Sequence, residues 1–312
     1  MAPFRPARYV WAVVRRLGHA LVVVGLLGLV LQRRALACAT CGCGDPTLTS
    51  VGVEKPYRNR LRVTVEERVG TQSMGAGDAR SDLVMTRTLL GVSYTPLSRL
   101  TVAAFVPFVA SHLHDRQHPG AWIRGLGDLE LQARVVVARE RSFAPRHLLW
   151  LVGGVRLPTG PRAKDERGFP FPDDDQPGNG SWDPLAGATY AWFGGSVTLY
   201  SSLLLRYPTS GARPYRFGAS LLSSSVAQLQ PFSWLALQLG VDLRQSWADR
   251  LANDAASPNT GGFVVGLVPG ALFNPWRDLL VRATVEVPTA QRLRGTQALG
   301  PQGVVSVSYD FL

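Results

Sequence analysis

Along most of the chain, hydrophobic residues alternate with polar residues at every second position. In residues 234–247 leucine and valine occupy five alternate positions, and Gln238, Asp242, Arg244 and Ser246 occupy positions of the opposite face. Successive side chains of a β-strand point to opposite faces, so this segment predicts a strand with one apolar face and one polar face. The pattern recurs from Asn59 onward, with no helical period of 3.6 residues.

The alternating segments divide the chain into about twelve expected strands, most of them near the 9–11 residues that a tilted membrane strand needs and longer than the 5–6 of soluble strands. The expected strands are 60–70, 83–95, 100–110, 127–139, 147–158, 184–193, 196–207, 213–229, 234–247, 262–273, 279–288 and 304–312.

Long polar connections alternate with short turns between these segments. Residues 112–124 and 159–182 form long connections, whereas 95–98 and 194–195 are tight turns. This alternation is typical of an outer-membrane barrel with both chain ends on the periplasmic side. We therefore predict an all-β fold, a membrane-spanning antiparallel up-and-down β-barrel. A soluble β-sandwich explains the alternation equally well, but not the strand lengths, the loop asymmetry and an export signal.

The final segment, 304–312, has Val305, Val307, Tyr309 and Phe311 on one face and serine and aspartate on the other. A strand with an aromatic residue at its end resembles the closing strand of bacterial outer-membrane barrels, although Leu312 follows the aromatic residue here.

The first 37 residues have the composition of an export signal. Arginines precede an apolar run at 20–31, which is too short for a membrane-spanning helix. Ala35-Leu36-Ala37 matches a signal-peptidase site, so we expect a signal peptide at 1–37. Acylation of Cys38 and an uncleaved anchor are the alternatives. We then expect a cysteine-containing periplasmic segment at 38–58 and an outer-membrane barrel at 59–312.

All three cysteines lie in that short segment, as Cys38, Cys41 and Cys43. Three thiolates at this spacing could hold a soft metal such as Cu(I), and a disulfide with one spare thiol is the alternative. No other cofactor is expected. A metal-binding or electron-transfer accessory is therefore the alternative to a channel.

The net charge of +11 excludes little by itself, because six arginines of the export signal account for more than half of it. No basic run with interleaved aromatic residues follows, so we do not expect a nucleic-acid partner.

In a barrel, the polar strand faces line the lumen. The arginines there could pair with acids as cross-strand ladders that brace the wall, or make the lumen favourable for anionic solutes. The expected lumen-lining residues are Arg62, Arg87, Glu130, Arg134, Arg156, Arg206, Arg216, Asp242, Arg244, Arg282 and Glu286.

Aromatic residues near the strand ends could form girdles at the two membrane interfaces. These residues are Trp122, Trp150, Trp182, Trp192, Trp234, Trp247, Trp276 and Tyr309.

Two histidine features are candidates for chemistry. His112, His114 and His118 could bind a metal, but such a loop is more often solvated. Enzymes of this architecture need a serine or carboxylate near a histidine, and His147 has no partner that the sequence assigns. We therefore expect no catalytic residue and no enzyme activity.

Three short glycine-rich motifs add a family resemblance. They are Gly125-Leu126-Gly127-Asp128-Leu129, Leu157-Pro158-Thr159-Gly160 and the run from Pro177 to Asp183, PGNGSWD. In this order they resemble a family of outer-membrane proteins named for the MetA pathway of phenol degradation. The resemblance implies a β-barrel that passes small, often hydrophobic molecules. Its partners would be outer-membrane lipid, the barrel-assembly machinery and a small-molecule solute.

Overall fold

The computed structural model describes residues 57–311, apart from 76, 78–79, 115–118, 143, 172, 212–214 and 277. The expected signal peptide and the three cysteines lie outside these residues. The strands are β1 (Arg60–Met74), β2 (Ser81–Leu97), β3 (Leu100–His114), β4 (Pro119–Leu126), β5 (Glu130–Arg139), β6 (His147–Arg156), β7 (Asp183–Gly194), β8 (Val197–Arg206), β9 (Ser220–Phe232), β10 (Leu235–Ser246), β11 (Gly262–Trp276), β12 (Leu279–Leu293) and β13 (Gln297–Phe311), with a short 3-10 turn, η3 (Asp173–Asp175).

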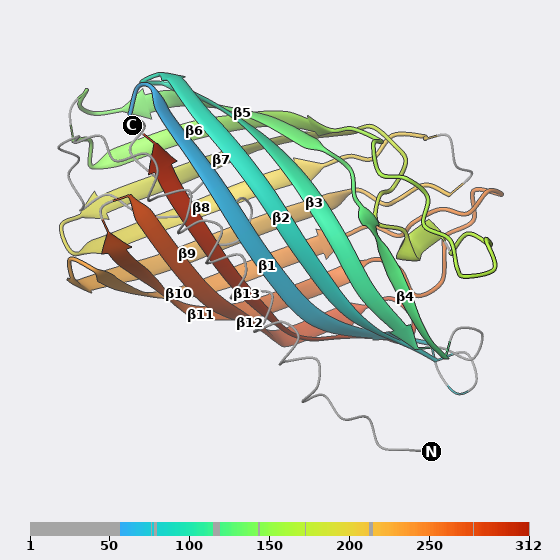
Figure 1. Ribbon diagram of the computed structural model, residues 1–312. Coiled ribbons are helices and arrows are strands. Elements are labelled where there is room, and N and C mark those ends of the chain that lie inside the picture. The colour runs from blue at the N-terminus through green and yellow to red at the C-terminus, as the bar shows by residue number, and fades with distance from the viewer. Residues whose placement is uncertain are drawn as a thin grey trace.

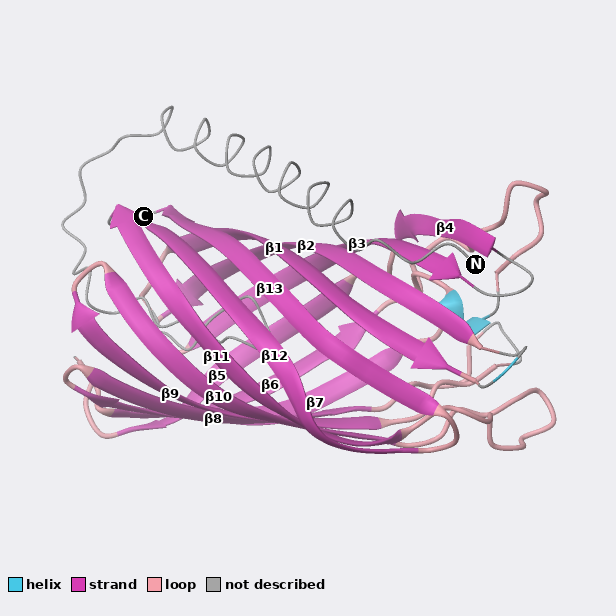
Figure 2. Cartoon of the chain, turned by 90° about the horizontal axis from the view of Figure 1, so that it is seen from below, coloured by secondary structure: helices cyan, strands magenta, loops and turns pink. Residues whose placement is uncertain are grey.

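The strands form one closed antiparallel sheet. Each strand pairs with its neighbours in sequence, except that β4 and β5 both pair with β3, and β1 also pairs with β13, which closes the ring (Figure 1). The closed wall contains twelve of these strands. β4 pairs only with the last part of β3, whereas β5 pairs with the first part of β3 and continues the ring. The prediction of an up-and-down barrel of about twelve strands is confirmed. The short turns lie at one end and the long connections at the other (Figure 2).

One stretch of the wall differs from the expectation. Residues 112–124 were expected to form a loop, but β3 continues to His114 and pairs there with β4. The first residues of β3, 100–105, pair with β5 instead. Thus β4 and β5 follow one another along the same edge, separated by residues 127–129. No sign of β4 is visible in the sequence, because the proline, glycines and arginine of β4 interrupt the alternation of hydrophobic and polar residues.

A second difference concerns the segment before β9. The expected strand 213–229 begins only at Ser220. Arg216 lies in the connection between β8 and β9, where its backbone forms a bridge with Arg250 of another connection. The backbone N–H and C=O groups of Arg216 thus form hydrogen bonds with Arg250 in a loop. Arg216 therefore does not belong to the barrel wall.

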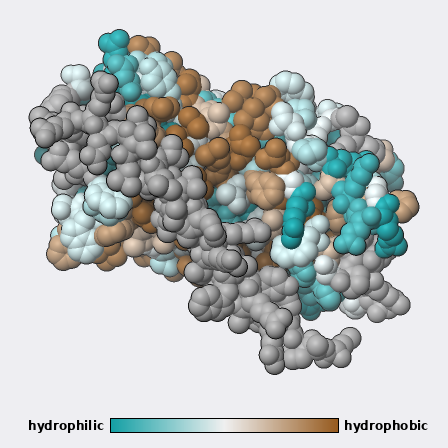
Figure 3. All heavy atoms as spheres, viewed as in Figure 1, coloured by the Kyte–Doolittle hydropathy of each residue, from teal (hydrophilic) through white to brown (hydrophobic). Residues whose placement is uncertain are grey.

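The barrel wall carries its hydrophobic side chains on the outside. Leu239 of β10 is 53% exposed, whereas the preceding Gln238 is only 5% exposed. Hydrophobic residues gather along the middle of the face shown in Figure 3, and hydrophilic residues gather at the end with the long connections. No helix within the described residues is long and apolar enough to cross a membrane.

Exposed aromatic residues lie at both rims of this outer face. Phe232 and Trp234 stack at the short-turn rim, and Trp234 also contacts Phe273 edge-on. Trp182 and Trp247 are exposed at the opposite rim, beside the ends of β7 and β10. Trp150 is an exception to the expected girdle, because it points inward and is 7% exposed.

The interior is partly filled by apolar side chains. Near the short turns, Val136, Leu148, Trp150, Tyr200 and Val226 belong to one buried cluster. At the opposite mouth the long connection between β6 and β7 folds inward, since its Phe171 packs with inward residues of β2, β3 and β4. Between these clusters the interior is polar.

Candidate functional site

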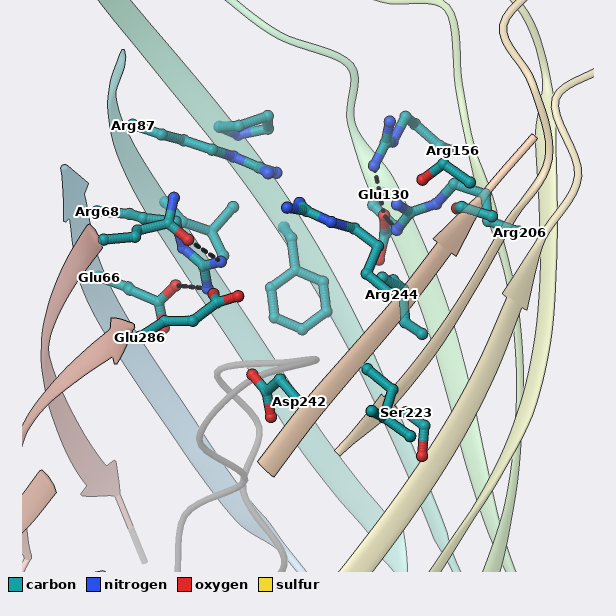
Figure 4. A pocket seen from close by; sticks show the side chains of 18 residues that line it. Glu66, Arg68, Arg87, Glu130, Arg156, Arg206, Ser223, Asp242, Arg244 and Glu286 are labelled. Atoms are coloured by element: carbon teal, nitrogen blue, oxygen red, sulfur yellow. Dashed lines mark hydrogen bonds and ion pairs between the residues drawn. The ribbon is translucent and has the colours of Figure 1, made fainter. Parts of the chain in front are cut away.

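A cavity of about 300 Å³ lies in the polar part of the lumen. Its side chains come from strands around the whole ring, and the charged ones point into it (Figure 4). The charged lining residues are Glu66, Arg68, Arg87, Glu130, Arg156, Arg206, Asp242, Arg244 and Glu286.

On one side of the cavity, Glu130 of β5 is shared between two arginines. It accepts a hydrogen bond of 2.9 Å from Arg206 of β8 and one of 3.5 Å from Arg156 of β6. Arg156 also lies 3.6 Å from the fully buried carboxylate of Asp183. The contacts of Arg156 span neighbouring strands, as a cross-strand charge ladder requires, whereas Arg206 reaches Glu130 past β7 and β6.

On the other side, Glu66 of β1 is shared in the same way. Its two carboxylate oxygens lie 3.1 Å from Arg68 of the same strand and 3.1 Å from Arg282 of β12. Arg282 and Glu66 are both buried, so this pair is desolvated and well fixed.

A third charged group lies toward the short-turn rim. Asp310 of β13 pairs with both Arg62 and Arg60 of β1, at 2.6 and 3.1 Å. Thr64 and Ser308 continue the contact between the same two strands, with hydroxyl oxygens 2.8 Å apart. The first and last strands are therefore joined by side chains as well as by their backbones.

The structure places nearly all the expected lumen-lining residues on inward faces, and Arg216 is the exception. Arg216 pairs instead with the exposed Asp254 of another connection. The inward residues are Arg62, Arg87, Glu130, Arg134, Arg156, Arg206, Asp242, Arg244, Arg282 and Glu286. Their role in passage of solutes stays a prediction.

The expectation omitted the apolar part of the cavity lining. Leu89 of β2, Phe105 and Pro107 of β3 and Leu222 of β9 line the cavity beside the arginines. β3 is apolar on both faces at this point, so polarity gave no signal for which face turns inward. Position along the strand was the one available signal, because Phe105 alternates with the outward Val106.

The three glycine-rich motifs meet at Asp128. Its buried carboxylate accepts hydrogen bonds from the backbone N–H of Gly160 at 2.9 Å and of Asn179 at 2.7 Å. A Cβ atom on Gly178 would lie 2.5 Å from the same carboxylate, so this approach requires glycine. The motifs thus attach the long connection to the break between β4 and β5.

No cluster of three metal-binding side chains occurs among the residues that the structure describes. His112 packs edge-on against Trp122 of β4, and His118 lies outside the described part. The cysteines also lie outside it, so a soft-metal site there stays a prediction.

Comparison with known proteins was made on sequence and on structure. No protein-family model and no curated protein matches the chain. Among solved structures, the COG4313 outer membrane channel from Pseudomonas putida F1 is similar with a TM-score of 0.66 and 14% sequence identity, covering 82% of this chain and 96% of that chain. The chain shares the fold of that channel.

Two other solved barrels are less similar. The translocator domain of autotransporter NalP from Neisseria meningitidis has a TM-score of 0.48 and 12% identity, covering 80% of this chain and 88% of that one. The toluene transporter TodX from P. putida has a TM-score of 0.45 and 11% identity, covering 82% and 91%.

Proposed function

We propose that the protein is an outer-membrane β-barrel channel through which small solutes pass without an energy source. The observation that carries this proposal is the distribution of side chains across the wall, with hydrophobic residues outside and charged residues inside. Leucine, valine and aromatic side chains face outward, while paired charges face the lumen. A closed barrel with an apolar exterior is the form in which strands span a bilayer, since closure leaves no unpaired edge in lipid.

The lumen supports passage of small molecules. The central cavity of about 300 Å³ stands at the small end of ligand sites, which hold roughly 300–1,000 Å³. Apolar clusters near the short turns and around Phe171 fill parts of the interior beyond this cavity. The solute is therefore small, and the similar channel of known structure is named as an outer membrane channel.

The remaining assignments complete the proposal. Residues 1–37 would direct export, the outer face would contact outer-membrane lipid, and the barrel-assembly machinery would insert the folded wall. No catalytic residue is assigned. The metal-binding alternative for Cys38, Cys41 and Cys43 is tested by the metal content of the purified mature protein against that of Cys41→Ser.

The first experiment is gel migration of protein from isolated outer membranes, with and without boiling. We expect the unboiled protein to run faster, because a closed barrel resists detergent. Liposomes containing the folded protein should then swell in neutral solutes at rates that fall steeply with solute size. An unshifted band in the soluble periplasmic fraction would contradict the barrel, and impermeable liposomes would contradict the channel.

A further inference from the structure

Two arginines of the central cavity stand apart from its ion-pair network. Arg87 of β2 and Arg244 of β10 extend from distant parts of the ring, and Figure 4 shows their guanidinium ends directed toward one another. Among the residues that the structure describes, neither makes an ion pair or a side-chain hydrogen bond. Each guanidinium carries five N–H donors and a positive charge.

The carboxylates nearest to the other arginines are already engaged. Glu66 is shared by Arg68 and Arg282, and Glu130 is shared by Arg156 and Arg206. Arg156 also pairs with Asp183, so three carboxylates serve four guanidinium groups. These pairs leave positive charge in excess around the space into which Arg87 and Arg244 point.

The other two acids of the cavity form no ion pair with Arg87 or Arg244 among the residues that the structure describes. Asp242 lies away from the ends of the two arginines, whereas Glu286 lies beside Glu66 (Figure 4) and also lines a second cavity together with Arg244. Asp242 precedes Arg244 by two residues on the same strand face, which places it one step further along the lumen. Neither acid therefore neutralises Arg87 or Arg244 by direct contact within the described part of the chain.

Two like charges that converge in a confined space repel one another unless an anion lies between them. The planar donor fork of arginine matches the two oxygens of a carboxylate. The same cavity presents Leu89, Phe105 and Leu222. The chemistry that fits is therefore a small anion with a planar oxygen pair and an apolar body.

We propose that Arg87 and Arg244 form a binding site for small organic carboxylates within the lumen. This inference rests on the proposed channel function and names the class of solute that the channel would select. Arg216, which the structure places in a connection, would have no part in the site.

The test uses the full mature protein in planar bilayers with benzoate as the probe and benzamide as its neutral counterpart. We expect benzoate to reduce the chloride current and benzamide to leave it unchanged. The variants are Arg87→Gln, Arg244→Gln and the double variant, with Arg216→Gln as the control. Gel migration without boiling establishes that each variant is folded.

Each single variant should weaken inhibition by benzoate about fivefold, the factor for one unit charge acting at about 4 Å in a water-like dielectric. The double variant should abolish it, and Arg216→Gln should behave as the unmodified protein. Equal inhibition by benzamide, or inhibition that persists in the double variant, would overturn the site.

A failure of the channel proposal is distinguishable from a failure of the site. Protein that is folded but passes no current would contradict the channel alone. Calorimetric titration of benzoate into the folded barrel in detergent then decides the site, because binding that is lost in the double variant supports it. Absence of heat with the unmodified protein would refute the site.

Discussion

Asp310 of β13 accepts two hydrogen bonds from the guanidinium group of Arg62 of β1, at 2.6 Å to one carboxylate oxygen and 2.7 Å to the other. The two residues are 248 positions apart in the sequence. Their two-point contact lies where β1 and β13 pair, the only backbone pairing of strands distant in sequence within the described wall. A bidentate pair of this kind fixes geometry as well as charge.

We expect Asp310→Asn to lower the free energy of unfolding by about 3 kcal/mol, because it leaves the buried Arg62 without its carboxylate. Reversible urea unfolding in lipid vesicles, followed by tryptophan fluorescence, measures this change. The control is Arg80→Gln, which removes an exposed ion pair with Asp82 and should leave the unfolding curve unchanged. Equal effects of the two variants would show that the ring is not secured by this pair.

The positions of the strands could be predicted because alternation is a local property. β10 was expected at 234–247 and lies at Leu235–Ser246, since its leucines and valines alternate without interruption. The ion pairs could not be predicted in the same way. Arg62 meets Asp310, and Arg282 meets Glu66, through the register of distant strands, which alternation within one strand does not determine.

The errors in the expected fold have local causes. The expected strand 213–229 began too early, because the backbone of Arg216 bridges to Arg250 and the carboxylate of Asp249 accepts a hydrogen bond from the N–H of Gly218. The separation of Arg87 and Arg244 from the ion pairs was likewise invisible in the sequence. Both look like the other lumen arginines until the partners of each are known.

The carboxylate of Asp128 should hold the long connection in place. Asp128→Ala removes the acceptor for two backbone N–H groups, each worth about 1.5–3 kcal/mol as a hydrogen bond to a charged group. We expect the amides of Gly160 and Asn179 to exchange with deuterium much faster in this variant, as mass spectrometry of the folded barrel would detect.

A matched control for this variant lies in the same connection. Asp165 accepts hydrogen bonds from the backbone of Arg167 and Phe169 at the loop tip. Asp165→Ala should speed exchange at the tip and leave Gly160 and Asn179 protected. If both variants expose the whole connection, Asp128 has no special role in its attachment.

The turn between β5 and β6 should respond to acid. Desolvation opposes ionisation of Glu140, but hydrogen bonds from the backbone N–H groups of His147 and Arg146 hold the pKa of this carboxyl below its ordinary value. A lowered pKa in the folded state means that the stabilisation is present above the unfolded value of about 4.3 and is lost as the pH falls through the folded value.

We therefore expect the amides of Arg146 and His147 to be protected from exchange at neutral pH and to lose protection below about pH 4. Exchange rates are to be corrected for the intrinsic effect of pH. Glu140→Gln supplies the comparison, because its protection should not change with protonation in this range. A turn that opens equally in both proteins would show that another group controls it.

The outward position of Leu239 distinguishes a membrane barrel from a soluble one. Leu239 lies in the middle of β10 and is 53% exposed. In water, a lysine at such a position changes stability by about 0.5 kcal/mol or less. In a bilayer, a lysine on the lipid face near the midplane costs about 2–4 kcal/mol.

We therefore expect Leu239→Lys to lower the free energy of unfolding by about 2–4 kcal/mol in lipid vesicles, measured by urea titration. Leu251→Lys is the control, because Leu251 is exposed on a connection beyond the strands and should tolerate the charge. The comparison isolates the effect of lipid, since both changes replace an exposed leucine by the same residue. Equal stability of the two variants would mean that the middle of β10 does not face hydrocarbon, and the assignment to the outer membrane would fail.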